Sequence, residues 1–404
     1  MNIIDNAGTR VDLDELIGRY NEGEQRSLQR AYAGSLLGID MDNTMFDNDL
    51  GVLVFLEKLN DPHFWDFDVD EFSKLLMPRR YKHALTQGAE GAHEGKISTE
   101  MSQLGLDIHA ACLNLYALIQ RIVQTKSTQK EMAQRVIREF ARKMVEFDQI
   151  FIRIDSHLTN LFDMPLLMRT RFFAGKELGD VHKMTLDVMN RNETSVDRII
   201  DLGISPELGK DLEMRVSEEQ IAEAHGKESQ HKMVDRLVVP VNEVRDIIRK
   251  ALLEWDKALG IVLTANLHGI GETAVDNSIY DFIRKKQNHK GTVIGSKLIR
   301  EEGVLKPRLL GEPVLGKQKV EEAMRLAGEM NKHFALAFGD SSTTDGPMMR
   351  KALDDGGSAI IVTKDIEEAK RRFYHVLRLY EVSEEISRRI FYLIPQFATP
   401  QLAA

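Results

Sequence analysis

Apolar residues along the chain follow two different periods. In "EMAQRVIREFARKMVEFDQIFIRI" (131–154) they recur every three or four residues, which predicts an amphipathic helix packed on other helices. Short apolar runs occur instead in "SLLGI" (35–39), "IVLT" (261–264), "FALAFG" (334–339) and "SAIIVT" (358–363). Runs of this length with β-branched residues are typical of buried strands. The sequence therefore combines a helical part with a part that contains strands.

Helical patterns separate the strand patterns in the C-terminal half. "KVEEAMRLAGEMNKH" (319–333), "GPMMRKALDD" (346–355) and "DIEEAKRRFYHVLRLY" (365–380) each follow or precede a short apolar run. Such alternation predicts a parallel sheet with helices on both faces. We expect an α/β protein with a Rossmann-like parallel sheet as its core and a large helical insertion.

The same patterns predict the domain organisation. Residues 1–33 read as an N-terminal helical segment, and residues 34–50 together with 240–381 form the α/β core. Residues 51–239 form the helical insertion, which we interpret as a cap. Residues 382–404 are a tail whose apolar side chains could dock on the body or on a second subunit of a homo-oligomer.

Composition narrows the classes of function. The 404 residues carry a formal net charge of −9, which argues against a general nucleic-acid binder because neutralising phosphates needs an excess of Lys and Arg. No uncharged apolar stretch reaches the roughly 18 residues of a membrane span, and the first residues lack the apolar region of a secretory signal. Cys112 is the only cysteine, so no internal disulfide forms. We expect a cytoplasmic protein that binds neither nucleic acid nor a membrane.

Four acidic residues and a threonine lie at or after the ends of the predicted strands. Asp40 and Asp42 lie at the end of the first strand, Thr264 ends the second, and Asp340 and Asp345 follow the third. The carboxyl ends of parallel strands meet at one rim, which is where ligands bind in such sheets. Two unit charges about 4 Å apart repel by roughly 4 kcal/mol at an effective dielectric constant of about 20, so these acids need a cation. Oxygen ligands without a His or Cys cluster select a hard ion, and Mg²⁺ bound with a substrate phosphate fits.

A carboxylate near such a metal can attack phosphorus and form an aspartyl-phosphate. A second acid two residues along can protonate the leaving alkoxide and later accept a proton from water. A threonine hydroxyl can bind a phosphoryl oxygen, and a lysine can neutralise the charge that develops in the transition state. The residue types at the predicted rim therefore suit phosphoryl transfer.

Four segments resemble the haloacid dehalogenase superfamily of phosphohydrolases. "GIDMDNT" is similar to its first motif, DxDxT, and "IVLT" to its second. "GKQKVEEA" resembles its lysine motif, and "GDSSTTD" its acidic fourth motif. "DMDNT", the "FFAGK" of the insertion and the residues around "VIGSKLIREEGVLKPRLLGE" look most like the branch of phosphoserine and phosphorylcholine phosphatases, in which the insertion is a helical cap of the C1 type.

The resemblance implies roles for individual acids. Asp40 would be the nucleophile and a Mg²⁺ ligand. Asp42 would be the general acid and base and would bind the metal through its backbone carbonyl. Asp340 would be the second carboxylate ligand. True dehalogenases lack the acid at the position of Asp42, because an ester intermediate on carbon needs no protonated leaving oxygen.

The resemblance also implies supporting residues. Thr264 would bind phosphate, Thr44 would brace the loop, and Asp345 would support the metal ligands. The lysine is either Lys319 or Lys317, because "GKQK" contains both; Lys319 is preferred since the helix follows it directly.

The predicted function is a Mg²⁺-dependent phosphomonoesterase that hydrolyses a small phosphorylated metabolite. A phosphotransferase would use the same residues, and a non-catalytic scaffold would use the insertion as a partner surface. Within the insertion, "MRTRFFAGK" (168–176) is the best candidate for substrate contact, although helix packing with a glycine break explains it equally well. His268 could touch a substrate, but a loop histidine without an identified partner is more often structural.

Overall fold

The computed structural model describes residues 2–22, 34–47, 50–58, 67–77, 79–89, 99–124, 140, 169–190, 239–255, 258–286, 293–381 and 383–395. The chain divides into two compact units. The first consists of Met1–Leu50, Val238–Lys297 and Leu310–Ala404; the second consists of Gly51–Leu237 and Leu298–Leu309. The amphipathic helix predicted over 131–154 lies outside the described residues, apart from Phe140.

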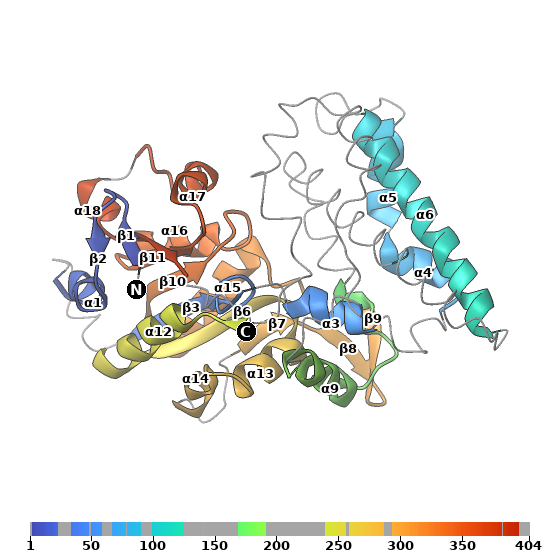
Figure 1. The fold of residues 1–404 in the computed structure, drawn as a ribbon, viewed down its shortest axis with the longest axis horizontal. Helices are drawn as coiled ribbons and strands as arrows, with labels where there is room; N and C mark the ends of the chain where they lie inside the picture. The colour runs from blue at the N-terminus through green and yellow to red at the C-terminus, as the bar shows by residue number, and fades with distance from the viewer. Residues whose placement is uncertain are drawn as a thin grey trace, which may run out of the picture. The chain divides into compact units, whose positions relative to one another are not determined.

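An eight-stranded sheet forms the centre of the first unit (Figure 1). Its strands are β1 (Asn2–Asp5), β2 (Arg10–Val11), β3 (Ser35–Asp40), β6 (Leu259–Leu267), β7 (Val293–Ser296), β10 (His333–Gly339), β11 (Ser358–Val362) and β12 (Ile390–Ile394). They are ordered β2-β1-β12-β11-β10-β3-β6-β7. The six strands from β12 to β7 are parallel, and β1 and β2 are antiparallel to their neighbours.

The first unit also contains helices. They are α1 (Leu13–Glu22), α12 (Asn242–Glu254), α13 (His268–Asp276), α14 (Asp281–Lys286), α15 (Gly316–Glu329), α16 (Gly346–Asp354), α17 (Ile366–Phe373) and α18 (Glu384–Ser387). Helices α15 and α16 contact β10, whereas α12, α13 and α14 contact β6. β3 and β11 are buried throughout, as the unbroken apolar runs predicted. The protein is an α/β protein with a mainly parallel, Rossmann-like central sheet.

The two ends of the chain agree with the prediction only in part. The segment 1–33 was predicted to be helical; it contains α1, but β1 and β2 precede that helix. Strand β1 pairs antiparallel with β12, so the predicted tail docks on the body of the chain, which was one of the two alternatives for it. Burial alternates along β1, with Ile3 buried, and the carboxylate of Asp5 accepts hydrogen bonds from the amides of Ala7 (3.1 Å) and Thr9 (2.8 Å). The helix predicted over 365–380 is also too long: α17 ends at Phe373, and turns follow.

A short antiparallel ribbon marks where the chain leaves the first unit and returns. It pairs β4 (Phe46–Asp47) with β5 (Val239–Pro240). The amide of Val241 donates to the carbonyl of Met45 at 2.8 Å. The buried hydroxyl of Tyr280 contacts the carbonyl of Met45 at 2.9 Å and the carbonyl of Val241 at 2.6 Å. Burial raises the pKa of Tyr280, so its hydroxyl remains a donor that ties the two crossing segments together.

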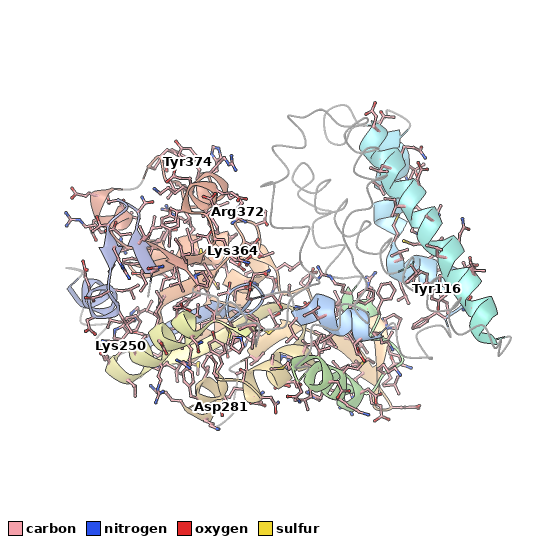
Figure 2. All side chains as sticks on the ribbon, in the orientation of Figure 1. Tyr116, Lys250, Asp281, Lys364, Arg372 and Tyr374 are labelled. Atoms are coloured by element: carbon pink, nitrogen blue, oxygen red, sulfur yellow. The ribbon has the colours of Figure 1, made fainter. Side chains whose placement is uncertain are left out.

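The second unit has its own core. Its described elements are α3 (Leu50–Lys58, which begins at the last residue of the first unit), α4 (Val69–Leu76), α5 (Arg79–Ala89), α6 (Thr99–Gln124), α9 (Leu178–Met189), β8 (Leu298–Glu301) and β9 (Val304–Leu309). Phe72 stacks on Tyr116 of α6, labelled in Figure 2, with ring centroids 3.8 Å apart. Phe172 lies 5.4 Å from Phe72 and 5.3 Å from Phe55, centroid to centroid.

The described part of "MRTRFFAGK", residues 169–176, packs inside this unit. Phe172 and Phe173 are buried, which favours the packing interpretation. The amide of Gly175 donates to the carbonyl of Leu305, and the amide of Leu305 donates to the carbonyl of Lys176, both at 2.8 Å. The β8–β9 hairpin therefore groups with the insertion, although its sequence lies within the segment 240–381 predicted for the core. None of the helices in the described parts of the chain is long and apolar enough to span a membrane.

Candidate active site

Two neighbouring strands at the centre of the sheet bring the first acids together. After β3 the chain adds β6 and β7 on one side of it, and β10, β11 and β12 on the other. The boundary between β3 and β10 is thus the point where strand order reverses, and such points form ligand-binding crevices at the carboxyl ends of the strands. Asp40 is the last residue of β3, and Asp340 follows β10.

Three carboxylates form a cluster at this edge. Oxygen atoms from Asp40, Asp340 and Asp345 all lie within 4.8 Å of one another. Lys319 of α15 has a side chain that is 1% exposed, and its ammonium group donates hydrogen bonds to Oδ1 of Asp40 and, at 2.6 Å, to Oδ1 of Asp345. One buried cation therefore joins acids that are about 300 residues apart in sequence.

Asp345 is fixed by the loop that precedes α16. Its Oδ2 accepts hydrogen bonds from the amides of Asp340 (3.2 Å) and Ser341 (3.0 Å), and Thr344 donates to its Oδ1 at 3.1 Å. A Cβ atom at Gly339 would lie 2.4 Å from the Cβ of Asp345. The absence of a side chain at Gly339 is what allows Asp345 to fold back over the end of β10.

Burial dominates the electrostatics of the cluster. It raises the pKa of Asp40 to about 7, and the charge of Asp345 adds to this effect while Lys319 opposes it. Burial, followed by the charges of Asp345 and Asp40, also raises the pKa of Asp340; Arg372 of α17, labelled in Figure 2, acts in the opposite direction. Burial alone would lower the pKa of Lys319, but the charges of Asp345 and Asp40 raise it, so this lysine stays protonated.

Asp42 lies in a different environment from Asp40. Its Oδ2 accepts hydrogen bonds from Nδ2 of Asn266 (2.7 Å) and Oγ1 of Thr264 (3.2 Å), and its Oδ1 accepts one from the amide of Leu50 (2.9 Å). Asn43, between Asp42 and Thr44, has a φ of 56°, a left-handed conformation that asparagine tolerates better than most residues. The turn after β3 therefore directs the two aspartates to different partners.

Thr44 and Thr264 are both fully buried beside these acids. The hydroxyl of Thr44 lowers the pKa of Asp40, although it does not meet the geometry of a hydrogen bond. Thr264 was predicted to end its strand, but β6 continues to Leu267, with a shift in register against β7 between Thr264 and Leu267. Thr264 and Asn266, two positions apart, both reach Asp42.

The two candidate lysines fall in different places. The side chain of Lys317 is 90% exposed and pairs with Glu321 at 3.2 Å, whereas Lys319 is in the cluster. His268 lies at the start of α13, and its Nε2 is 3.5 Å from Glu272, so it has a partner on its own helix. Sequence reasoning missed Asn266. Its position two residues after Thr264 was the available signal, because both side chains could then turn toward one loop.

The donor set fits a divalent cation. When ionised, the three carboxylates and Lys319 carry an excess of two negative charges. The candidate ligands are all oxygen atoms, which suits Mg²⁺ or Ca²⁺ better than softer metals. The sequence prediction named Asp40, Asp340 and the backbone of Asp42 as ligands; the carboxylate cluster contains Asp345 in addition. A bound cation would offset the repulsion that raises the pKa of Asp40.

Chemically, the site combines a buried carboxylate beside a protonated lysine with a second carboxylate held by neutral donors. The first arrangement suits a nucleophile near positive charge, and the second suits proton transfer. Lys364, which follows β11, is exposed and pairs with Asp47 at 3.2 Å (Figure 2).

Comparisons with known proteins do not assign a family. No family model and no curated protein matches the sequence. A solved structure of a conserved protein of unknown function from Anaerococcus prevotii DSM 20548 has 14% identity and a TM-score of 0.47, covering 95% of this chain and 94% of that one. A protein of unknown function from Bordetella pertussis Tohama I has 12% identity and a TM-score of 0.37, covering 83% and 94%.

Proposed function

We propose that the protein is a Mg²⁺-dependent phosphomonoesterase of the haloacid dehalogenase type, acting on a small phosphorylated metabolite. The observation that carries this proposal is the cluster of Asp40, Asp340 and Asp345 around the ammonium group of Lys319. Positive charge beside a buried carboxylate stabilises both the ionised nucleophile and the phosphoryl group that it attacks.

The proposed reaction has two steps. In the first, a carboxylate oxygen of Asp40 attacks phosphorus, the bond to the ester oxygen breaks, and the leaving oxygen takes a proton from the carboxyl group of Asp42. In the second, Asp42 accepts a proton from water, the water oxygen attacks phosphorus, and the bond to Asp40 breaks. The products are an alcohol and inorganic phosphate, and both aspartates return to their starting states.

Other residues would bind and orient the substrate and the metal. The hydroxyl of Thr264 would donate to a phosphoryl oxygen, and Lys319 would neutralise charge on the phosphoryl group. The carboxylates of Asp40, Asp340 and Asp345 would hold Mg²⁺, which supplies positive charge when bound. We further propose that Gly51–Leu237 with the β8–β9 hairpin acts as a helical cap that selects the substrate.

The test is release of p-nitrophenol from p-nitrophenyl phosphate, measured with Mg²⁺ and with EDTA. We expect Mg²⁺-dependent turnover that Asp40→Asn lowers by roughly four orders of magnitude. Lys319→Met should lose most activity, while Lys317→Met, on the same helix but exposed, should retain it. Turnover that survives EDTA or Asp40→Asn would refute the proposal.

Product analysis separates hydrolysis from transfer. With added alcohols, a hydrolase releases one inorganic phosphate for each p-nitrophenol, whereas a phosphotransferase diverts phosphate into a new ester. The absence of turnover on a panel of small phosphate esters would favour a non-catalytic scaffold.

A further inference from the structure

Asp42 is held by donors from two separate parts of the chain. Asn266 and Thr264 donate to its Oδ2 at 2.7 and 3.2 Å, and the amide of Leu50 donates to its Oδ1 at 2.9 Å. The bond from Asn266 is the shortest of the three. Its orientation follows from chemistry, because only the NH₂ end of the amide can donate to a carboxylate oxygen.

Thr264 cannot donate a hydrogen bond to Asp42 throughout the proposed reaction. Its hydroxyl has a single proton, which is donated to Asp42, while its oxygen accepts a hydrogen bond from the amide of Asn266 at 3.1 Å. If Thr264 donates to a bound phosphate, it can no longer donate to Asp42. The side-chain amide of Asn266 can still donate to Oδ2 of Asp42.

We propose that Asn266 is the positioning residue for Asp42, keeping its carboxyl group in place when Thr264 turns its hydroxyl to the substrate. This inference rests on the proposed phosphomonoesterase function and extends it to a residue outside the four motifs. Asn266 is 4% exposed, so its side chain is confined by its surroundings. It acts on the substrate only through Asp42.

If Asn266 positions Asp42, the loss of activity caused by removing Asn266 should depend on the leaving group of the substrate. When the bond from phosphorus to the ester oxygen breaks, Asp42 transfers its proton to that oxygen. Phenolate is more basic than p-nitrophenolate, so it depends more on this proton. A misplaced Asp42 should therefore slow the hydrolysis of phenyl phosphate more than that of p-nitrophenyl phosphate. A general loss of folded protein would slow both equally.

The experiment compares kcat/KM for phenyl phosphate and p-nitrophenyl phosphate in the full-length protein with Mg²⁺. For Asn266→Ala we expect a loss of roughly 100-fold on phenyl phosphate and a loss about ten times smaller on p-nitrophenyl phosphate. Asn266→Asp keeps the size of the side chain but replaces the donor with a carboxyl group, and it should show the same steeper dependence. The matched control is Asn277→Ala, whose amide bonds the carbonyl of Thr273 in α13 at 2.9 Å; it should leave the ratio unchanged.

The outcomes separate the two proposals. If the wild type hydrolyses both esters and the Asn266 variants lose equal activity on both, or none, the positioning role is wrong while the phosphatase stands. If the wild type hydrolyses neither ester, or Asp40→Asn keeps its activity, the proposed function itself fails. Thermal melting of each variant shows whether folded protein was compared in every case.

Discussion

At the scale of single residues, the acid cluster lacks enough positive charge. Among the described residues, Lys319 is the cation that pairs with Asp40 and Asp345, and Arg372 acts on Asp340 in addition. Burial makes the deficit costly, since it raises the pKa values of Asp40 and Asp340. Without a divalent cation, the folded state therefore favours the protonated forms of Asp40 and Asp340.

The first prediction follows for stability against pH. A carboxyl group with a raised pKa binds more protons in the folded protein than in the unfolded chain, so stability falls as pH rises. For Asp40 the fall should begin near its ordinary pKa of 3.8 and end above about 7. The slope for one such group is at most about 1.4 kcal/mol per pH unit. Urea unfolding in EDTA from pH 4 to 8 measures it.

Asp40→Asn is the control for this prediction, because the amide has nearly the same size and does not titrate. Its unfolding free energy should decrease less over the same pH range than that of the wild type. With Mg²⁺ present, the trend should reverse, since only ionised carboxylates bind the metal well. Parallel curves for the two proteins in EDTA would show that the folded state does not penalise the ionised form of Asp40.

Some of these residues were predicted from the sequence, and one was missed. Lys319 was preferred over Lys317 because the residues after it resemble the helix that follows the lysine motif; the structure places Lys319 inside α15 and against Asp40. Asn266 was missed as a neighbour of Asp42, although it follows Thr264 by two positions and residues at that spacing in a strand face the same side. Hydrophobic patterning does not indicate which polar side chain of another segment such a residue contacts.

At the scale of elements, the end of β10 and the start of α16 are packed too closely for a side chain between them. A Cβ at Gly339 would lie 2.4 Å from the Cβ of Asp345 and 2.6 Å from its Oδ2. The second prediction is that Gly339→Ala costs about 1–3 kcal/mol of stability, as overpacking does. It should also lower Mg²⁺ affinity, because Asp345 must move. Urea unfolding and calorimetric titration with Mg²⁺ measure the two effects.

Gly328→Ala is the matched control. Gly328 lies within α15, and a Cβ there meets no atom within 4 Å. Alanine is the better helix former, so this variant should gain roughly 0.5–1 kcal/mol. Equal changes in the two variants would mean that contact with Asp345 is not what requires glycine at position 339.

Element boundaries were predicted less well than element types. Strand β6 runs past Thr264 to Leu267 because its later residues still pair with β7. Helix α17 stops at Phe373 although the helical pattern continues, and turns follow up to Glu381. Pairing with a neighbouring strand extends β6, and local turns end α17, so neither boundary follows the periodicity of the sequence.

At the scale of the whole molecule, the parallel part of the sheet was predictable and its edge was not. Alternation of strands and helices between 259 and 362 predicts parallel pairing. Strands β1 and β12 pair across almost the full length of the chain, so no local pattern indicates their partner. The β8–β9 hairpin was likewise not predictable from local patterns. It pairs with Gly175 and Lys176 and belongs to the second unit, although its sequence lies between segments of the first.

The division into two units gives a last prediction, because the proposed metal ligands all belong to the first. A ligand stabilises the structure that binds it, by about 2.7 kcal/mol at a concentration 100 times its dissociation constant. Mg²⁺ alone should therefore slow hydrogen exchange in β3 and β10 and leave exchange in α5 and α6 unchanged. Hydrogen exchange followed by mass spectrometry measures this, and Asp340→Asn should abolish the protection. Protection confined to α5 and α6 would place the metal in the second unit, and the assignment of Asp40 and Asp340 as its ligands would then be wrong.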